Sequence, residues 1–184
     1  MMRNAQIVAS GMFVPEKVVP NSYFNELLGE DVDTWLRENL TIKERRWCNK
    51  NQSTADLCVE AAQVILENAK VKADELDLLI IATDTPEYIS PSTASVVQYR
   101  LGASKAGTFD VNTACAGFVT ALDIASKYIR SDKKYNKVLV IGAYAMSKYL
   151  NLQDKKTVTL FADGAAGVLL TSTKNELEGF LTSK

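Results

Sequence analysis

Two short apolar runs limit the fold of this chain more than any other feature. Leu78–Ala82 is apolar throughout, and residues 138–141 form a second run of the same kind. Continuous apolar runs of this length are typical of central strands that are covered on both faces. Helical patterns separate the strands. The clearest begin near Ser53, at Thr93 and after Cys115, and Ser92 and Gly102 are expected to cap and to end the second of them. This alternation predicts an α/β fold with a parallel or mixed sheet.

The part of the chain before Ser53 predicts shorter elements. Asn21 or Ser22 is expected to cap the first helix, and Gly29 to end it. The elements are a strand at 7–11, an irregular segment at 15–20, helices at 23–28 and 33–40, and a loop or edge strand at 41–47.

Two residues are predicted to lie in the core. Cys58 lies on the apolar face of the helix that Ser53 or Thr54 caps, as small buried cysteines commonly do. Trp35 lies in the predicted helix at 33–40, and its residue type alone favours a core anchor over an exposed stacking surface.

The C-terminal part predicts connections and one more strand. Residues 143–157 predict a polar connection, and Asp163-Gly164 predicts a turn that leads into a strand. The glycines lack the spacing of a P-loop or dinucleotide motif, so we interpret them as packing or turn residues. Residues 175–184 resemble the first turn of an element that continues. The 184 residues suit one domain or one half of a two-part fold.

The composition argues against several classes of protein. With 21 basic and 22 acidic residues the formal net charge is −1, which does not favour binding to nucleic acid or a membrane surface. No apolar run is long enough to span a bilayer, and Met1–Asn4 lacks the apolar core of a secretory signal. Three widely separated cysteines form no metal motif and no disulfide framework, so we expect a reducing cytoplasm and no metal.

The stretch Thr108–Phe118, with Cys115 near its centre, is the best candidate for chemistry. It begins like the end of a buried strand and finishes as the start of a helix. A helix N-terminus favours a thiolate, which is the nucleophilic form of cysteine. The alternative is a small buried cysteine that packs a tight turn. The chain has no histidine, which is the commonest acid or base partner of a catalytic cysteine. Either Cys115 is therefore not catalytic, or that partner lies outside this chain.

Ordered motifs over nearly the whole chain resemble the thiolase superfamily, and most closely the beta-ketoacyl-(acyl carrier protein) synthase III group. Each motif is weak alone, and their order and spacing make the resemblance specific. The motifs are Asp33-Thr-Trp35, Ile42-Lys-Glu-Arg45, Asp56-Leu57 with Glu60-Ala-Ala62, Ala82-Thr-Asp-Thr-Pro86, Pro91-Ser92, Gln98 with Leu101-Gly102, Phe109-Asp110, Ala114-Cys-Ala-Gly-Phe118, Val138-Leu-Val-Ile-Gly142 and Phe161-Ala-Asp-Gly-Ala165.

The resemblance implies the N-terminal half of a thiolase-like protein, in which two similar α/β halves stack their sheets. Residues 1–184 then form the first domain of a longer synthase. Cys115 matches the acyl-accepting cysteine, whose backbone N–H is one of two oxyanion-hole amides. The catalytic His and Asn, and the other amide, belong to the second half, which accounts for the absence of histidine here.

The implied reaction is the 3-oxoacyl-(acyl carrier protein) synthase III condensation of fatty acid biosynthesis. Cys115 accepts an acyl group from a thioester, and malonyl-acyl carrier protein then loses carbon dioxide and attacks the acyl-cysteine. The implied partners are acyl carrier protein, an acyl-CoA or acyl-carrier primer, and a second copy of the chain in a homodimer. No cofactor is implied, and the 184 residues alone are expected to be inactive in condensation.

Several positions depart from the family pattern and leave the acyl donor open. Trp35 matches a tryptophan that stacks on the adenine of a coenzyme A primer, but Asn39 replaces the usual arginine and Leu40-Thr41 the usual Thr-Gly pair. Ser90 replaces a bulky residue that can form part of the wall of the acyl pocket in the partner subunit. Residues 162–166 replace the usual Gly-Asp-Gly-Ala-Gly turn. A carrier-bound or longer primer fits these changes.

Two other interpretations stay open. The chain is compatible with another superfamily synthase, such as a 3-hydroxy-3-methylglutaryl-CoA synthase or a secondary-metabolite ketosynthase. It is also compatible with a short non-catalytic subunit of a synthase complex. The intact setting Ala114–Phe118 argues against that subunit, because a purely structural half has no need of the thiol.

Overall fold

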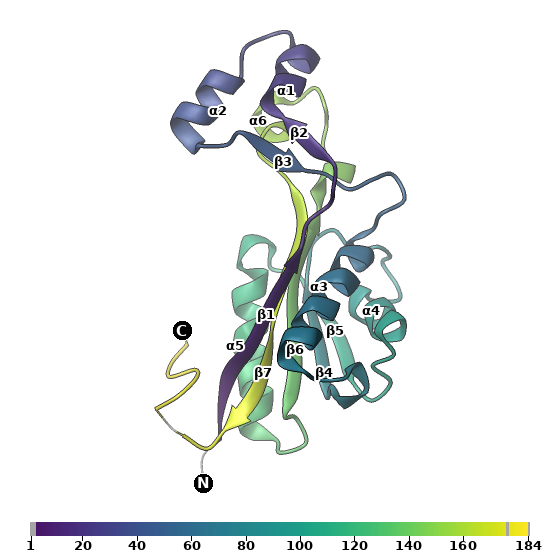
Figure 1. Cartoon of the computed structure of the whole chain (residues 1–184), viewed down its shortest axis with the longest axis vertical. Coiled ribbons are helices and arrows are strands. Elements are labelled where there is room, and N and C mark those ends of the chain that lie inside the picture. The colour runs from purple at the N-terminus through teal and green to yellow at the C-terminus, as the bar shows by residue number, and fades with distance from the viewer. Residues whose placement is uncertain (1–2, 176, 184) are drawn as a thin grey trace.

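The computed structural model describes residues 3–175 and 177–183, so expectations that rest on Met1, Met2, Glu176 and Lys184 lie outside the described part. The five long strands are β1 (Asn4–Phe13), β4 (Leu78–Ala82), β5 (Gly107–Val111), β6 (Lys137–Ala145) and β7 (Asp163–Thr173). They form one sheet in the order β1-β7-β6-β4-β5 (Figure 1). β4 is parallel to β5 and β6, and β7 is antiparallel to β6 and β1, so the predicted mixed α/β sheet is confirmed.

Helices cover both faces of this sheet. α3 (Thr54–Ala69) and α4 (Thr93–Leu101) lie on one side, and α5 (Gly117–Ser131) lies on the other (Figure 1). In β4, Leu79 and Ile81 join the core under α3 and α4, while Leu78 and Ile80 join the core under α5. The apolar run is thus buried on both faces, as predicted. Among the described helices, none has the length and apolar character needed to cross a membrane.

A small lobe sits at one end of the long strands β1 and β7 (Figure 1). It has its own core, made of Val19, Phe24, Trp47 and Val158. The lobe consists of β2 (Val18–Pro20) paired antiparallel with β3 (Glu44–Arg46), and of the helices α1 (Asn21–Leu28), α2 (Asp33–Leu40) and α6 (Lys155–Val158). Of the two alternatives expected at 41–47, a loop or an edge strand, the structure shows a short strand, and its partner β2 falls in the segment that was expected to be irregular.

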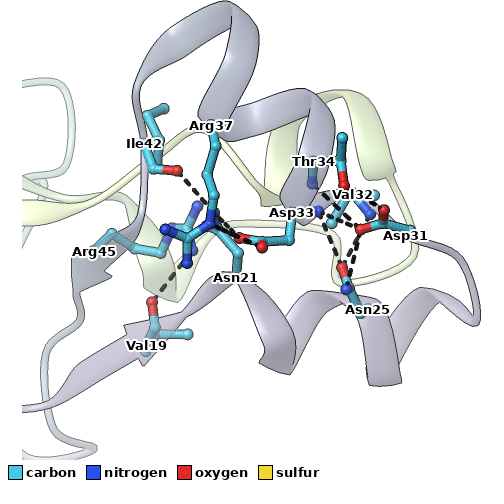
Figure 2. A network of polar contacts seen from close by, with 10 residues as sticks. All are labelled: Val19, Asn21, Asn25, Asp31, Val32, Asp33, Thr34, Arg37, Ile42 and Arg45. Atoms are coloured by element: carbon cyan, nitrogen blue, oxygen red, sulfur yellow. Dashed lines mark hydrogen bonds and ion pairs between the residues drawn. The ribbon is translucent and has the colours of Figure 1, made fainter.

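The prediction that Asn21 or Ser22 caps α1 is wrong. Pro20 is the residue before the helix, and no side chain caps the helix start. The Asn21 amide instead donates 2.7 Å hydrogen bonds to Asp33 Oδ1 and to the Ile42 carbonyl (Figure 2). The Asn21 side chain therefore forms tertiary hydrogen bonds instead of the helix cap that the local sequence predicts. The end of α1 at Gly29, with φ of 69°, is as predicted.

The predicted turn at Asp163-Gly164 is also wrong, because both residues are the first two of β7. Neither has a left-handed backbone. The small side chains over 164–167 allow β7 to pair with β1 and β6 at the same time. The connection expected at 143–157 is shorter than predicted, because β6 continues to Ala145 and α6 occupies 155–158.

The helix starts near the candidate site are capped as predicted. Ser53 and Asp56 form a capping box at α3. Ser92 Oγ accepts a 3.2 Å hydrogen bond from Ser95 N at α4, and Gly102 ends that helix. The structure adds Asp110 of β5, whose carboxylate accepts from Thr93 N at 2.7 Å and from Ala94 N at 2.8 Å. A strand side chain thus satisfies the first amides of the neighbouring helix.

Asp110→Ala is expected to lower the free energy of unfolding by about 2–3 kcal/mol. The substitution leaves two helix amides without their charged acceptor and removes a favourable charge at the helix N-terminus. Asp110→Asn keeps one acceptor oxygen and should lose less than half as much. Urea unfolding of the three chains measures both effects. A loss below about 0.5 kcal/mol for the alanine variant, as for an ordinary surface site, would contradict this account of the contact.

Candidate active site

A sharp turn carries Cys115 from β5 into α5. A single 3₁₀ turn spans Ala114–Ala116, and α5 begins at the next residue, Gly117. Ala114 has a left-handed backbone with φ of 47°, and the Ala114 N–H donates a 3.3 Å hydrogen bond to Asn112 Oδ1. The predicted strand-to-helix junction is confirmed. Cys115 is exposed, so the alternative of a cysteine buried to pack the turn is wrong.

The turn is held close to the sheet by Gly117. This residue is buried, and a Cβ atom there would lie 3.3 Å from the Cβ of Ala82 at the end of β4. Such contact is tighter than most side chains accept, so glycine lets the first turn of α5 approach the strand end. The approach places Cys115 at the carboxyl edge of the parallel strands, where α/β proteins build their sites.

Cys115 lines a cavity of about 310 Å³ at this edge. The walls come from the ends of β4 and β6, the cysteine turn, and the segment that leads into β7. The lining residues are Ala82, Thr83, Asp84, Ala114, Cys115, Phe118, Gly142, Ala143, Tyr144, Phe161 and Gly164. Most of these groups are apolar, and Asp84 is the one carboxylate among them. The cavity therefore offers a largely apolar wall beside an exposed thiol.

Tyr144 and Phe161 form one aromatic wall of the cavity. Their ring centroids are 6.0 Å apart, and the ring planes are tilted by 49°. Burial raises the pKa of the Tyr144 phenol, and the nearby Asp84 carboxylate and Cys115 raise it further. The phenol thus stays protonated, and Tyr144 lines the same cavity as Cys115 with a neutral polar group. Tyr144 was not predicted as a site residue, because it lies in the segment expected to be a polar connection.

Three threonines organise the loop that leaves β4. Thr85 N donates to Thr83 Oγ1 at 3.0 Å, and Thr85 Oγ1 accepts from Ala145 N at 3.0 Å. Thr54 Oγ1, at the start of α3, donates to the Thr85 carbonyl. All three side chains are buried. The loop is thereby tied to α3 and to the end of β6, which fixes the part of the cavity wall that Thr83 and Asp84 form.

Trp35 occupies a different place from the one that residue type predicted. Its side chain is 54% exposed, so the core-anchor prediction is wrong. Leu36 takes the buried position on α2, and Trp47 supplies the tryptophan of the small-lobe core. Trp35 lies instead along a groove of about 460 Å³. The groove is lined by Glu30, Asp31, Val32, Trp35, Leu36, Lys155, Lys156, Thr159 and Leu160.

Polar contacts hold the start of α2 against the rest of the small lobe (Figure 2). Asp31 accepts from Thr34 Oγ1 at 2.6 Å and from Asp33 N at 3.0 Å. Asp33 pairs with Arg37 at 2.7 Å and accepts from Asn21. Hydrogen bonds from Thr34 lower the pKa of Asp31, and those from Asn21 and then Arg37 lower the pKa of Asp33. Both carboxylates are therefore ionised when they hold the start of α2.

Arg45 on β3 is a buried cation at the base of this lobe. It is 5% exposed and donates to the carbonyls of Val19 at 3.2 Å and Thr159 at 2.7 Å. Its guanidinium lies 4.4 Å from the centroid of the Phe24 ring. Burial lowers the pKa of Arg45. The side chain thus joins β2, β3 and the segment before β7 into one unit.

The other two cysteines are buried. Cys58 is 0% exposed in α3, so the core prediction is confirmed, and Cys48 is 8% exposed after β3. Burial, with the nearby Asp163 carboxylate, raises the pKa of Cys48 to about 12, and burial raises the pKa of Cys58. Within the described residues, Cys115 is the one thiol open to reagents.

These raised thiol pKa values predict a loss of stability in alkali. An unfolded cysteine ionises near pH 8.5, whereas folded Cys48 keeps its proton to about pH 12. Between these values the native state binds more protons, so the stabilisation present below about pH 8.5 is lost by about 1.4 kcal/mol per pH unit for that thiol. Urea unfolding of wild type and Cys48→Ala at pH 9 and pH 10.5 should show a shallower decline for the variant. Equal slopes would contradict the assignment.

The mixed sheet, with helices on both faces and the cysteine turn at its carboxyl edge, is a thiolase-like α/β fold. The family model described as 3-Oxoacyl-[acyl-carrier-protein (ACP)] synthase III matches residues 109–184. The Beta-ketoacyl-[acyl-carrier-protein] synthase III of Clostridium novyi (strain NT) is 45% identical over 170 residues, which are 92% of this chain and 52% of the relative.

Solved structures give the same result. The 3-oxoacyl-[acyl-carrier-protein] synthase III from Aquifex aeolicus VF5 matches with a TM-score of 0.88 and 37% identity, over 94% of this chain and 55% of that one. The priming beta-ketosynthase of the R1128 polyketide pathway matches with a TM-score of 0.89 and 28% identity, over 95% of this chain and 52% of that one. The chain is similar to the N-terminal half of beta-ketoacyl-[acyl-carrier-protein] synthase III proteins, and it spans about half the length of the relatives it matches.

Proposed function

We propose that this chain is the acyl-accepting half of a 3-oxoacyl-(acyl carrier protein) synthase III-type condensing enzyme in fatty acid biosynthesis. The observation that carries the proposal is the exposed Cys115 on a strand–helix turn, beside an apolar cavity at the carboxyl edge of the sheet. The same chain matches the N-terminal half of enzymes that bear this name. Cys115 is the nucleophile in this proposal, and its backbone N–H forms part of the oxyanion hole.

The proposed first step moves an acyl group onto the cysteine. The Cys115 thiolate attacks the carbonyl carbon of a donor thioester, and the tetrahedral intermediate expels the donor sulfur, which leaves as a free thiol after taking up the proton that Cys115 lost. The positive end of α5 lies next to the attacking sulfur, because the helix begins two residues after Cys115. The apolar cavity wall then covers the acyl chain.

The second step needs groups that this chain lacks. Malonyl-acyl carrier protein loses carbon dioxide, and the resulting carbanion attacks the acyl-cysteine carbonyl and releases the Cys115 thiolate. A catalytic His and Asn are expected in a C-terminal half, since the present sequence contains no histidine. We therefore expect this chain alone to accept acyl groups slowly and to form no condensation product.

We propose that the Trp35 groove receives the far end of the donor. The exposed indole offers a stacking surface, and Lys155 and Lys156 of α6, which also line the groove, supply positive charge for a phosphate group. Lys155 also pairs with Glu30 at 3.1 Å, which holds the two walls together. A coenzyme A thioester and a carrier-protein phosphopantetheine both carry such phosphates.

We also infer a homodimer in the cytoplasm. β5 is an edge strand of the main sheet, so its outer side is available to pair with the same strand of a second copy. Three unpaired cysteines fit a reducing compartment. Light scattering behind a sizing column measures the mass in solution, and a strictly monomeric chain at all concentrations would contradict the dimer.

A panel of donors tests the proposed function. The whole chain is incubated with acetyl, butyryl and octanoyl groups carried by coenzyme A or by acyl carrier protein, and intact mass follows the adduct. We expect one acyl group per chain. A clear preference for acetyl-CoA would exclude the longer or carrier-bound primer, whereas no adduct from any donor would contradict the acyl-acceptor role. A preference for longer groups would support the longer primer.

A further inference from the structure

One short segment borders both candidate binding regions. Thr159 and Leu160 line the Trp35 groove, while Phe161 and Gly164 line the Cys115 cavity. The position of this segment therefore sets the groove and the cavity relative to each other. Asp163, which lies between these lining residues, is 4% exposed and contributes to neither surface.

Three donors from two distant parts of the chain converge on the Asp163 carboxylate. Cys48 N donates to Oδ2 at 2.6 Å, and Ser147 N donates to Oδ1 at 2.9 Å. The Ser147 hydroxyl also donates to Oδ2. Cys48 directly follows the β3–Trp47 stretch of the small lobe, whereas Ser147 lies in the turn after β6. One side chain thus connects the small lobe, the end of β6 and the start of β7.

Two further hydrogen bonds attach the small lobe to the same segment. Trp47 Nε1 donates to the Phe161 carbonyl at 3.1 Å, and Arg45 donates to the Thr159 carbonyl at 2.7 Å. Both of these bonds come from β3 or the residue after it, and both end on backbone atoms. Asp163 adds a link from the small lobe to Ser147. Ser147 lies in the turn after β6, the strand that contains Tyr144.

The chemistry of the contact requires a carboxylate. Within the described residues no lysine or arginine forms an ion pair with Asp163, so its charge is balanced by hydrogen bonds alone. Each of the three partners is a donor, and an ionised carboxylate is the side chain that only accepts. An asparagine amide would turn an N–H group toward at least one of these donors and break that link.

We propose that Asp163 is a positioning residue, which holds the Trp35 groove at a fixed place relative to Cys115 so that a long thioester donor bound in the groove presents its carbonyl to the thiol. This inference rests on the proposed function and deepens it. It assigns Asp163 no contact with the substrate. Reactivity of a donor that spans both regions depends on Asp163, whereas reactivity of a donor too short to reach Trp35 does not.

Paired donors with one acyl group test the proposal. The whole chain reacts with hexanoyl-CoA and with the short hexanoyl N-acetylcysteamine thioester, and intact mass gives both rates of acylation. The ratio of the two rates is compared in wild type, Asp163→Asn, Ser147→Ala and the matched control Asp132→Asn. Asp132 is exposed at the far end of α5, outside both binding regions.

We expect the rate ratio to fall by about tenfold or more in Asp163→Asn, because a shift of about 1 Å between anchor and nucleophile costs up to about 100-fold in rate. Ser147→Ala removes only one donor, so it should lower the ratio by a smaller factor without unfolding the chain; it decides the matter if Asp163→Asn does not fold. The short thioester and the Asp132 control should stay within about twofold of wild type.

The outcomes separate this inference from the proposed function. If both thioesters slow equally in the Asp163 and Ser147 variants, Asp163 has a general structural role and the inference is overturned. If wild type shows no advantage for the coenzyme A donor over the short one, the groove assignment in the proposed function fails instead. If neither thioester acylates wild type, the acyl-acceptor role itself fails.

Discussion

Cys115→Ser is expected to abolish the rapid reaction of the native chain with iodoacetamide. Cys115 is exposed, whereas Cys48 and Cys58 are 8% and 0% exposed. A buried thiol reacts only when the structure opens, and opening of a stable core is rare enough to slow the reaction by at least about 100-fold. Intact mass should show one modification of wild type and none of the variant over the same time.

Denaturant supplies the control for this prediction. In strong urea wild type should take three modifications and Cys115→Ser two, which shows that the missing label reflects the fold and the substituted position. A conservative Cys58→Ala variant should keep the single native label. Native labelling of the Cys115→Ser chain at the wild-type rate would mean that another thiol is accessible, and the assignment of Cys115 as the reactive residue would be wrong.

Gly167→Ala is expected to lower the free energy of unfolding by about 3 kcal/mol or more. Gly167 is buried in the middle of β7, where it pairs with Gly11 of β1 and with Ile141 of β6. A Cβ atom there would overlap the Val140 carbonyl oxygen and lie 3.0 Å from the Ile141 Cα. Both obstacles are backbone atoms of a paired strand, so the added methyl group displaces the β6–β7 ladder itself.

Gly164→Ala is the matched control on the same strand. A Cβ atom at Gly164 would lie 3.4 Å from a side-chain carbon of Val14, which is ordinary contact. Its effect should stay below about 1 kcal/mol. Urea or thermal unfolding of the two variants measures the difference. Equal, small losses in both would show that the pairing of β7 with β6 tolerates a side chain at the centre, contrary to the packing described.

The main sheet was predictable because its signals are local. The run Leu78–Ala82 shows apolar residues at every position, and only a strand covered on both faces buries all of them. The caps at Ser53 and Ser92 depend on residues within one helical turn, so they were also predicted. The cysteine turn was predicted from the change between extended and helical patterns around residue 113.

The remaining features depend on contacts between distant positions. Asn21 donates hydrogen bonds to Asp33 and Ile42 instead of capping α1, and Asp163 accepts one from a backbone amide 115 positions earlier in the chain. No periodicity or turn preference reports such a contact. Trp35 was misplaced for a related reason, since the packing of the small lobe selected its neighbour Leu36 and the distant Trp47 for the core.

The most direct test of the account is the location and chemistry of the acyl group after the whole chain reacts with acetyl-CoA. The adduct is mapped by digestion and mass spectrometry, before and after treatment with neutral hydroxylamine, which cleaves thioesters but leaves amides intact. The account predicts a hydroxylamine-labile acetyl group on the peptide that contains Cys115, and none on the peptides of Cys48 and Cys58. A stable acetyl group spread over lysines, with Cys115 unmodified, would contradict it.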